Sequence, residues 1–162
     1  MAKPLSPGDP IPPIALPDAE GVERRSDQLA GRPLVLFFYP KDDTPGCTAE
    51  VCAFRDSYAD LQALGAEVWG VSGDDAASHR RFVARHQLPF PLLVDRGNSL
   101  RQAFGVPSVL GLLPGRVTYV IDGQGIVQHV FNNLLDGPSH RREAIAALQR
   151  LQGQAATGRG SG

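Results

Sequence analysis

The residues best suited to chemistry are the two cysteines of the chain, Cys47 and Cys52, which lie five positions apart. A pair this close outside a secreted disulfide scaffold indicates redox chemistry or metal binding. A structural zinc site needs four ligands, and no histidine lies near the pair, which argues against metal. A thioredoxin-type reductase would show Cys-x-x-Cys, which the wider spacing here does not match. Two inert buried thiols remain an alternative at this point.

Cys47 is expected at the start of a helix, shortly after a buried strand. The apolar run Pro33–Tyr39 is typical of a central strand, and Thr44-Pro-Gly forms a turn before the cysteine. Free backbone N–H groups and the positive end of the helix dipole favour a thiolate at such a position. Asp42 and Asp43 oppose it, but we expect both to be solvated and screened. A nearby arginine would outweigh them, although the residues alone do not say which one.

The remaining pattern predicts an α/β domain with the thioredoxin-like three-layer fold, in which helices flank a mixed central sheet. Its parallel part comes first, and an antiparallel hairpin turning at Gly123-Gln-Gly125 comes last. The predicted strands are a short hairpin at 14–25 and then 33–39, 66–72, 90–94, 116–122 and 126–131, and the predicted helices are 49–64, 78–86, 98–104 and 139–151.

The 162 residues suit one domain, which we assign to residues 1–151, followed by a flexible tail at 152–162. Sixteen basic and seventeen acidic residues without a basic stripe argue against a nucleic-acid partner. The N-terminus lacks the apolar core of a secretory signal, and no apolar run is long enough to span a membrane. We therefore expect a cytoplasmic protein with no membrane partner, with a processed organelle protein as the alternative, and we expect no metal and no cofactor.

The segment from Pro40 to Cys52 resembles the active-site signature of a known family. Pro40-x-x-x-Thr44-x-x-Cys47 is similar to that of the peroxiredoxins, and the spacing of the cysteines resembles their Q subfamily, also called bacterioferritin comigratory protein. The stretches 71–75 and 114–122 also resemble that subfamily, and the similarity covers about residues 4–151. Glu50 stands where relatives often carry Gln, a departure that leaves the implied roles intact.

The resemblance implies a thiol-dependent peroxidase in which Cys47 attacks hydrogen peroxide and organic hydroperoxides. Thr44 and Arg116 would bind and polarise the peroxide, and Pro40 would shield the pocket from water. Cys47 would become a sulfenic acid and condense with Cys52, the resolving cysteine, to an intramolecular disulfide. Thioredoxin or a related dithiol would then reduce the disulfide, and a monomer is the expected form.

Two other functions remain open on the sequence alone, a thioredoxin-like holdase chaperone and a one-way redox relay. The holdase needs neither the motif nor the cysteine pair, and the relay predicts disulfide transfer without peroxide turnover. We interpret the histidines at 79, 86, 129 and 140 as structural or solvated, with the first two on a helix surface. Asp74-Asp75 is interpreted as a turn and helix cap.

The two cysteines cannot form a disulfide if both lie on one intact helix. Five residues rise about 7.5 Å and turn about 500° on a radius of about 2.3 Å, which puts the Cα atoms about 8.6 Å apart. A disulfide needs less than about 7 Å, and the two side chains would also point to different faces. Forming the bond should therefore unwind residues 45–54, where a glycine and two β-branched residues weaken the helix.

We predict that oxidation lowers the amide protection of residues 47–54, because the unwound segment loses its helical hydrogen bonds. Hydrogen exchange of the reduced and the oxidised protein measures this change directly. Equal protection of the segment in the two samples would rule out the unwinding.

Overall fold

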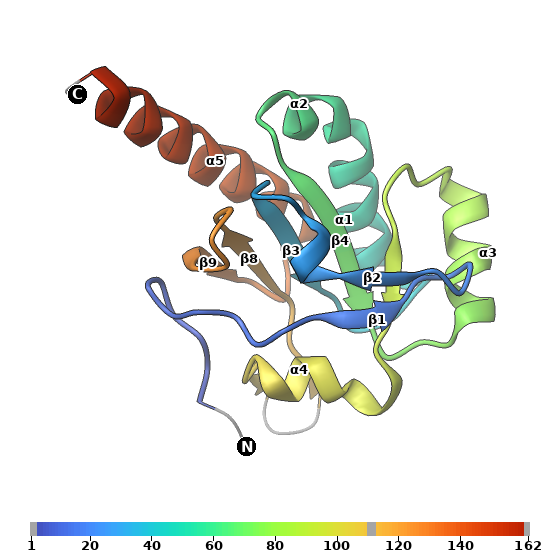
Figure 1. Ribbon diagram of the computed structural model, residues 1–162. Helices are drawn as coiled ribbons and strands as arrows, with labels where there is room; N and C mark the ends of the chain where they lie inside the picture. Colours follow the sequence, from blue (N-terminus) through green and yellow to red (C-terminus); the bar gives the residue numbers. More distant parts are fainter. Residues whose placement is uncertain (1–2, 110–112, 161–162) are drawn as a thin grey trace.

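A five-stranded mixed sheet forms the centre of the computed structural model, which describes residues 3–109 and 113–160 (Figure 1). The strands are, in chain order, β1 Ala15–Pro17, β2 Glu23–Arg25, β3 Leu34–Phe38, β4 Glu67–Ser72, β5 Leu92–Val94, β6 Ser108–Val109, β7 Leu113–Pro114, β8 Val117–Ile121 and β9 Val127–Asn132. The helices are the short 3-10 turns η1 Ser26–Gln28 and η2 Arg96–Asn98, and α1 Pro45–Asp56, α2 Tyr58–Ala63, α3 Ala76–His86, α4 Ser99–Ala103 and α5 Gly137–Gly160.

The central sheet has the strand order β5-β4-β3-β8-β9, with β3 in the middle. β3 and β4 are parallel, as are β4 and β5, whereas β8 runs antiparallel to β3 and β9 antiparallel to β8. The parallel strands therefore come first in the chain and the hairpin last, as the sequence predicts. The antiparallel pairing places Val117, at the start of β8, opposite Phe38, at the end of β3.

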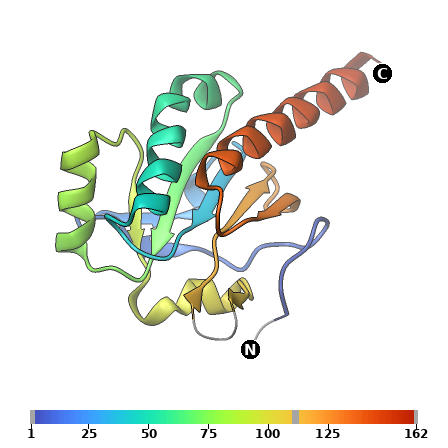
Figure 2. The same ribbon diagram turned by 180° about the vertical axis from the view of Figure 1, so that it is seen from behind.

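Both faces of the sheet are covered, which explains why β3 is a continuous apolar run. Every residue of β3 is buried. Val35 and Phe37 belong to one core cluster, which also contains buried residues of α1, α2, α3 and α5. Leu34, Leu36 and Phe38 belong to the other cluster, which includes residues of α4 and the N-terminal segment. Figure 2 shows α1, α2 and α5 in front of the sheet, and Figure 1 shows α4 and the β1–β2 hairpin on its other side.

The helix that carries the cysteines differs from the sequence prediction. The predicted helix 49–64 is divided into α1 and α2, because the backbone leaves helical geometry at Ser57 (φ −107°, ψ 8°). α1 also begins earlier, at Pro45, where proline loses no helical hydrogen bond.

The C-terminal helix α5 runs to Gly160, past Leu151, where the sequence predicts a flexible tail. Figure 1 shows this end of α5 projecting away from the sheet. Glutamine and alanine at 152 and 154–156 favour helix, so the helix propagates through a stretch whose glycines suggest a tail.

Among the described residues, no helix combines the length and the apolar character that crossing a membrane requires.

Candidate active site

Cys47 lies in the first turn of α1, close to the carboxyl end of β3. Thr44 is the N-cap residue and Pro45 is the first helical residue, and the Thr48 N–H donates to the Thr44 carbonyl at 2.8 Å. The N–H groups of Gly46 and Cys47 precede this first helical bond, so they belong to the unpaired donors of the helix start. The thiol itself is buried, with 1% of the residue exposed. These features place the sulfur where the helix dipole and free donors favour a negative charge.

Arg116 binds the sulfur of Cys47. Its Nη2 donates to the Cys47 Sγ at 3.3 Å, and its Nη1 donates to the Glu50 Oε1 at 2.7 Å. Its Nε donates to the Leu134 carbonyl at 3.1 Å, which fixes the plane of the guanidinium. Arg116 directly precedes β8, so the pairing of β8 with β3 delivers it to the start of α1. A side chain in place of Gly46 would have its Cβ 3.1 Å from Nη2, so glycine allows this close approach.

Glu50, one turn after Cys47, is a third member of the site. It is fully buried, and burial raises the pKa of its carboxyl to about 8, although Arg116 acts in the opposite direction. From the sequence alone, Glu50 is only a minor departure from the peroxiredoxin pattern. The structure instead shows that the Glu50 carboxyl and the Cys47 sulfur share one guanidinium, so the charge of one affects the other.

His140 of α5 lies behind Glu50. Its Nδ1 is 3.4 Å from the Glu50 Oε2 and 2.8 Å from the Thr118 hydroxyl, and its Nε2 is 2.8 Å from the Asn133 carbonyl. Burial lowers the pKa of His140 to about 4. The sequence does not reveal this contact of His140, because α5 is distant in the chain from both Glu50 and Thr118.

Arg101 of α4 is a second buried arginine that the sequence does not single out. Its Nη2 donates to the Tyr39 carbonyl at 2.9 Å, and its Nη1 donates to the Gly115 carbonyl at 2.7 Å. Tyr39 precedes Pro40 and Gly115 precedes Arg116, so one side chain ties together the two segments that carry the site. Burial lowers the pKa of Arg101, and Cys47 is among the groups that raise it, which places this charge within electrostatic reach of the sulfur.

Thr44 and Pro40 lie on the loop that leads from β3 into α1, and both are half-buried. The Thr44 hydroxyl donates to the Lys41 carbonyl at 2.9 Å, so its hydrogen is directed to the loop and not to the sulfur. The lone pairs of this hydroxyl remain available to a bound substrate.

The expectation that Asp42 is solvated is wrong, because this residue is buried under the loop. Its carboxylate accepts from the Tyr39 hydroxyl, contacts the His79 Nδ1 at 2.7 Å and accepts from the Ser78 hydroxyl at 2.8 Å. His79 is likewise fully buried, not on a helix surface. The loop folds onto the start of α3, which the local sequence does not reveal.

Asp74 extends the same cluster, since its Oδ2 accepts from the Asp42 N–H at 2.8 Å. Oxygen and nitrogen atoms of Asp42, Asp74 and His79 lie within 4.8 Å of one another, a grouping that could hold a metal ion. Asp42 and His79 already hydrogen-bond each other, and the His79 Nε2 lies 2.9 Å from the Leu93 carbonyl. The cluster therefore anchors the active-site loop through hydrogen bonds. Asp75 caps α3 as predicted, accepting from the Ser78 N–H at 2.8 Å.

Cys52 occupies a different environment on the same helix. It is a free thiol, only partly buried, and it lines an open groove of about 480 Å³ with Asp43, Pro45, Thr48, Ala49, Arg85 and His86. Cys47 is also free but lies under Arg116. Both cysteines are on the intact helix α1, which is the geometry that the unwinding argument assumes.

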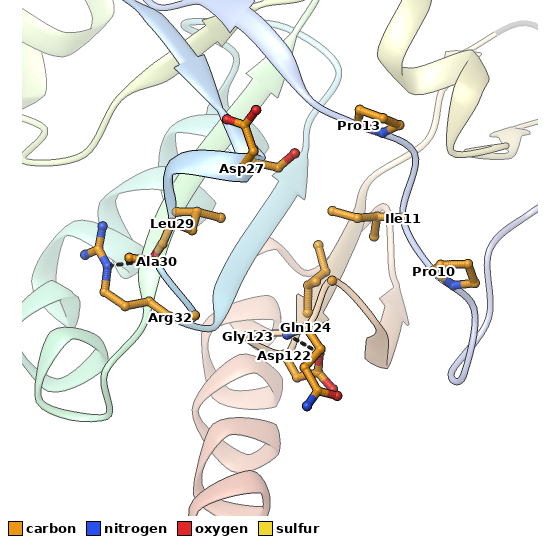
Figure 3. A pocket seen from close by; sticks show the side chains of 14 residues that line it. Pro10, Ile11, Pro13, Asp27, Leu29, Ala30, Arg32, Asp122, Gly123 and Gln124 are labelled. Atoms are coloured by element: carbon orange, nitrogen blue, oxygen red, sulfur yellow. Dashed lines mark hydrogen bonds between the residues drawn. The ribbon is translucent and has the colours of Figure 1, made fainter.

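A larger pocket, of about 560 Å³, lies at the opposite end of the sheet (Figure 3). The turn before β3, the β8–β9 hairpin and the N-terminal segment line it, and none of the site residues above belongs to it. Pocket size alone would therefore misplace the reactive centre of this protein.

Comparison with known proteins identifies the class of protein. Residues 7–130 match the model of the AhpC/TSA family. A wheat protein named peroxiredoxin Q, chloroplastic, is 49% identical over 148 residues, which cover 91% of this chain and 68% of that protein. The crystal structure of the peroxidoxin BcpB from Mycobacterium tuberculosis has a TM-score of 0.82 at 36% identity, covering 89% of this chain and 96% of that one. The bacterioferritin comigratory protein of Xanthomonas campestris has a TM-score of 0.78 at 30% identity, covering 85% and 90%.

The chain belongs to the AhpC/TSA family, and its resemblance to the peroxiredoxin Q subfamily is confirmed. The thioredoxin-like fold predicted from the sequence is confirmed by the same structures. The protein is a thiol-dependent peroxidase, an oxidoreductase whose substrate is a peroxide and whose electrons come from a thiol reductant.

The expected cytoplasmic location is wrong. Relatives from wheat, Sedum lineare and Arabidopsis thaliana are named as chloroplastic proteins, which contradicts this expectation. The expectation rested on the absence of a leader sequence.

The shifted pKa values of Glu50 and His140 predict how stability depends on pH. Glu50 has its pKa raised from 4.5 to about 8, so it makes unfolding easier as pH rises through that window. His140 has its pKa lowered from 6.5 to about 4, so it makes unfolding harder as pH rises between those values. The two effects oppose each other below pH 6.5, which leaves a net fall in stability between pH 6.5 and about 8.

We expect the free energy of unfolding of the reduced protein to fall in this window by up to about 1.4 kcal/mol per pH unit. Glu50→Gln should remove the fall, because glutamine does not ionise. Urea denaturation at a series of pH values measures it. Glu20→Gln, which changes an exposed carboxylate in the turn between β1 and β2, serves as the matched control and should keep the fall. The same slope in the wild type and Glu50→Gln would contradict the assignment.

Proposed function

We propose that Cys47 is the peroxidatic cysteine and Cys52 the resolving cysteine of this peroxidase. The observation that carries the proposal is the hydrogen bond of 3.3 Å from Arg116 to the Cys47 sulfur, at the buried start of a helix. A positive charge and free N–H groups beside a thiol stabilise its thiolate, which is the form that attacks peroxide. We further propose one domain at residues 1–151, acting as a monomer, because one chain supplies every side chain of the site.

The first step is the attack of the Cys47 thiolate on one peroxide oxygen. An S–O bond forms, the O–O bond breaks, and the alkoxide or hydroxide that leaves takes up a proton. Arg116 and the N–H groups of the first helical turn stabilise the charge that develops on the leaving oxygen. The Thr44 hydroxyl, already donating to the Lys41 carbonyl, has lone pairs left to accept the peroxide hydrogen. Pro40 closes the pocket beside it without adding an N–H donor.

The second step condenses the Cys47 sulfenic acid with the Cys52 thiol, releasing water and forming the disulfide. Because both residues lie on α1, the helix must unwind for the sulfur atoms to meet. Thioredoxin or a related dithiol then reduces the disulfide. The open groove beside Cys52 supports this order, since the unwound segment would present the disulfide at the surface.

Alkyl hydroperoxides are proposed as substrates alongside hydrogen peroxide. The similar protein from Xanthomonas campestris is described as having alkyl peroxide reduction activity. A holdase or a one-way redox relay would not require an arginine on the sulfur of a buried cysteine, so the site favours the peroxidase.

Cys47→Ser should abolish peroxide turnover, because a serine hydroxyl is not ionised at neutral pH and attacks O–O bonds poorly. Steady-state peroxide consumption with a thioredoxin system measures this. Cys52→Ser is the matched variant, since it changes the same atom five residues later. It should allow one round of sulfenic acid formation, fail to recycle through the intramolecular bond and over-oxidise more readily. Substantial turnover by Cys47→Ser would show that the nucleophile is assigned wrongly.

Arg116→Met should slow the reaction of Cys47 with peroxide about a hundredfold, as expected when one charge-stabilising donor is lost. The rate of sulfenic acid formation, followed by trapping and mass spectrometry, measures the effect. Arg81→Met, at an exposed position of α3, removes the same charge away from the site and should leave the rate unchanged. Equal rates for Arg116→Met and the wild type would mean that another arginine serves the sulfur.

A further inference from the structure

The two oxygens of the Glu50 carboxyl have different surroundings. Oε1 accepts a hydrogen bond from Arg116 at 2.7 Å. Oε2 is buried and has no hydrogen-bond partner in the part of the chain that the structure describes. A buried carboxylate oxygen without a donor is costly, because ionised groups taken out of water need compensating hydrogen bonds. The site therefore binds the Glu50 carboxyl at Oε1 but offers nothing to compensate a negative charge at Oε2.

The neutral His140 ring faces that oxygen with a nitrogen that carries no hydrogen. The His140 Nε2 lies 2.8 Å from the Asn133 carbonyl, which can only accept, so Nε2 carries a hydrogen. In the neutral ring Nδ1 is then an acceptor, which takes the hydrogen of the Thr118 hydroxyl at 2.8 Å and has none to give to the Glu50 Oε2 at 3.4 Å. Two acceptors facing each other repel unless a proton lies between them. The geometry thus requires a proton on either the Glu50 carboxyl or the His140 Nδ1.

We propose that Glu50 carries this proton as a neutral carboxylic acid held against neutral His140, so that the undivided charge of Arg116 acts on the Cys47 sulfur. Glu50 and His140 are then positioning residues, which act on the reaction through Arg116. The proposal deepens the proposed function and rests on it, since it concerns the same sulfur. The raised pKa of Glu50 and the lowered pKa of His140 agree with this distribution of charge.

The charged and titratable groups around the pair come from three elements. Arg116, before β8, faces Glu50 and favours its ionised form. Cys47 lies on the same face of α1 as Glu50, and as a thiolate it places a negative charge beside Arg116. Asp136 and Glu143, near the start of α5, favour a charged His140, and Arg116 opposes them. Burial is the largest influence on both Glu50 and His140, and it favours two neutral groups.

A reciprocal effect follows from the shared guanidinium. The Cys47 thiolate and an ionised Glu50 compete for the positive charge of Arg116. The thiolate therefore favours a protonated Glu50 as much as a protonated Glu50 favours the thiolate, because coupling between two sites is reciprocal. Replacing the thiolate by a neutral group leaves the whole charge of Arg116 to the carboxyl. The Glu50 proton should then be lost at lower pH.

Infrared spectroscopy of the reduced protein tests the proposal without measuring activity. At neutral pH, the infrared difference spectrum between the wild type and Glu50→Gln should contain the carbonyl band of a neutral carboxylic acid. The band should disappear as pH rises through about 8, and at lower pH in Cys47→Ser. Glu20→Gln, at an exposed carboxyl in the turn between β1 and β2, is the matched control and should leave the band in place. Glutamine at 50 can still accept from Arg116 and donate to His140, so the variant should fold.

Nitrogen NMR of the His140 ring shows which partner holds the proton. A neutral ring with the hydrogen on Nε2 at neutral pH supports the proposal, and a doubly protonated ring overturns it. A Glu50 band that is absent at neutral pH, or unchanged in Cys47→Ser, would also overturn it. These outcomes differ from failure of the proposed function, which would appear as peroxide turnover by Cys47→Ser.

Discussion

The active site depends on one guanidinium that serves two acceptors. Arg116 donates to the Cys47 sulfur and to the Glu50 carboxyl, and its third contact, to the Leu134 carbonyl, leaves it little freedom to turn. The rest of the fold delivers and holds this group. The pairing of β8 with β3 brings Arg116 to the start of α1, and Arg101 clamps the carbonyls that precede Pro40 and Arg116. In place of Gly137, at the start of α5, a Cβ would lie 2.7 Å from the Gly46 carbonyl, so a side chain there would force the two helix starts apart.

The same helix that builds the site also limits it. α1 carries Cys47, Glu50 and Cys52, and its intact form keeps the two thiols in separate environments. The disulfide therefore requires α1 to open, and opening would carry Glu50 out of the pocket that holds it neutral. Once solvated, Glu50 would ionise and release its proton, so raising the pH towards 8 should favour the open form over the helical one. Substrate binding and disulfide reduction would in this way use two conformations of one segment.

The sequence predicts a mixed sheet with its parallel part first and its antiparallel hairpin last, and it predicts Cys47 at a helix start, because these features depend on local apolar runs and turn residues. Arg116 could be found only through the peroxiredoxin resemblance, since nothing in its immediate neighbours marks it. The burial of Asp42, His79 and Glu50 could not be predicted, because each pairs with residues far away in the chain. The same holds for the pairing of His140 with Glu50. Extension of α5 to Gly160 shows that helix formers can outweigh nearby glycines.

Glu50 and Cys47 are coupled electrostatically through Arg116, and a double-mutant cycle measures this coupling. The rate of sulfenic acid formation would be measured on either side of the Glu50 pKa of about 8 in four proteins, the wild type, Glu50→Gln, Arg116→Met and the double variant. A Cys52→Ser background keeps the reaction at its first step. We expect the wild-type rate to fall on the alkaline side and the Glu50→Gln rate to show no fall. Glu50→Gln should change nothing further in a protein that already carries Arg116→Met. An effect of Glu50→Gln on the alkaline rate that is equally large with and without Arg116 would contradict it.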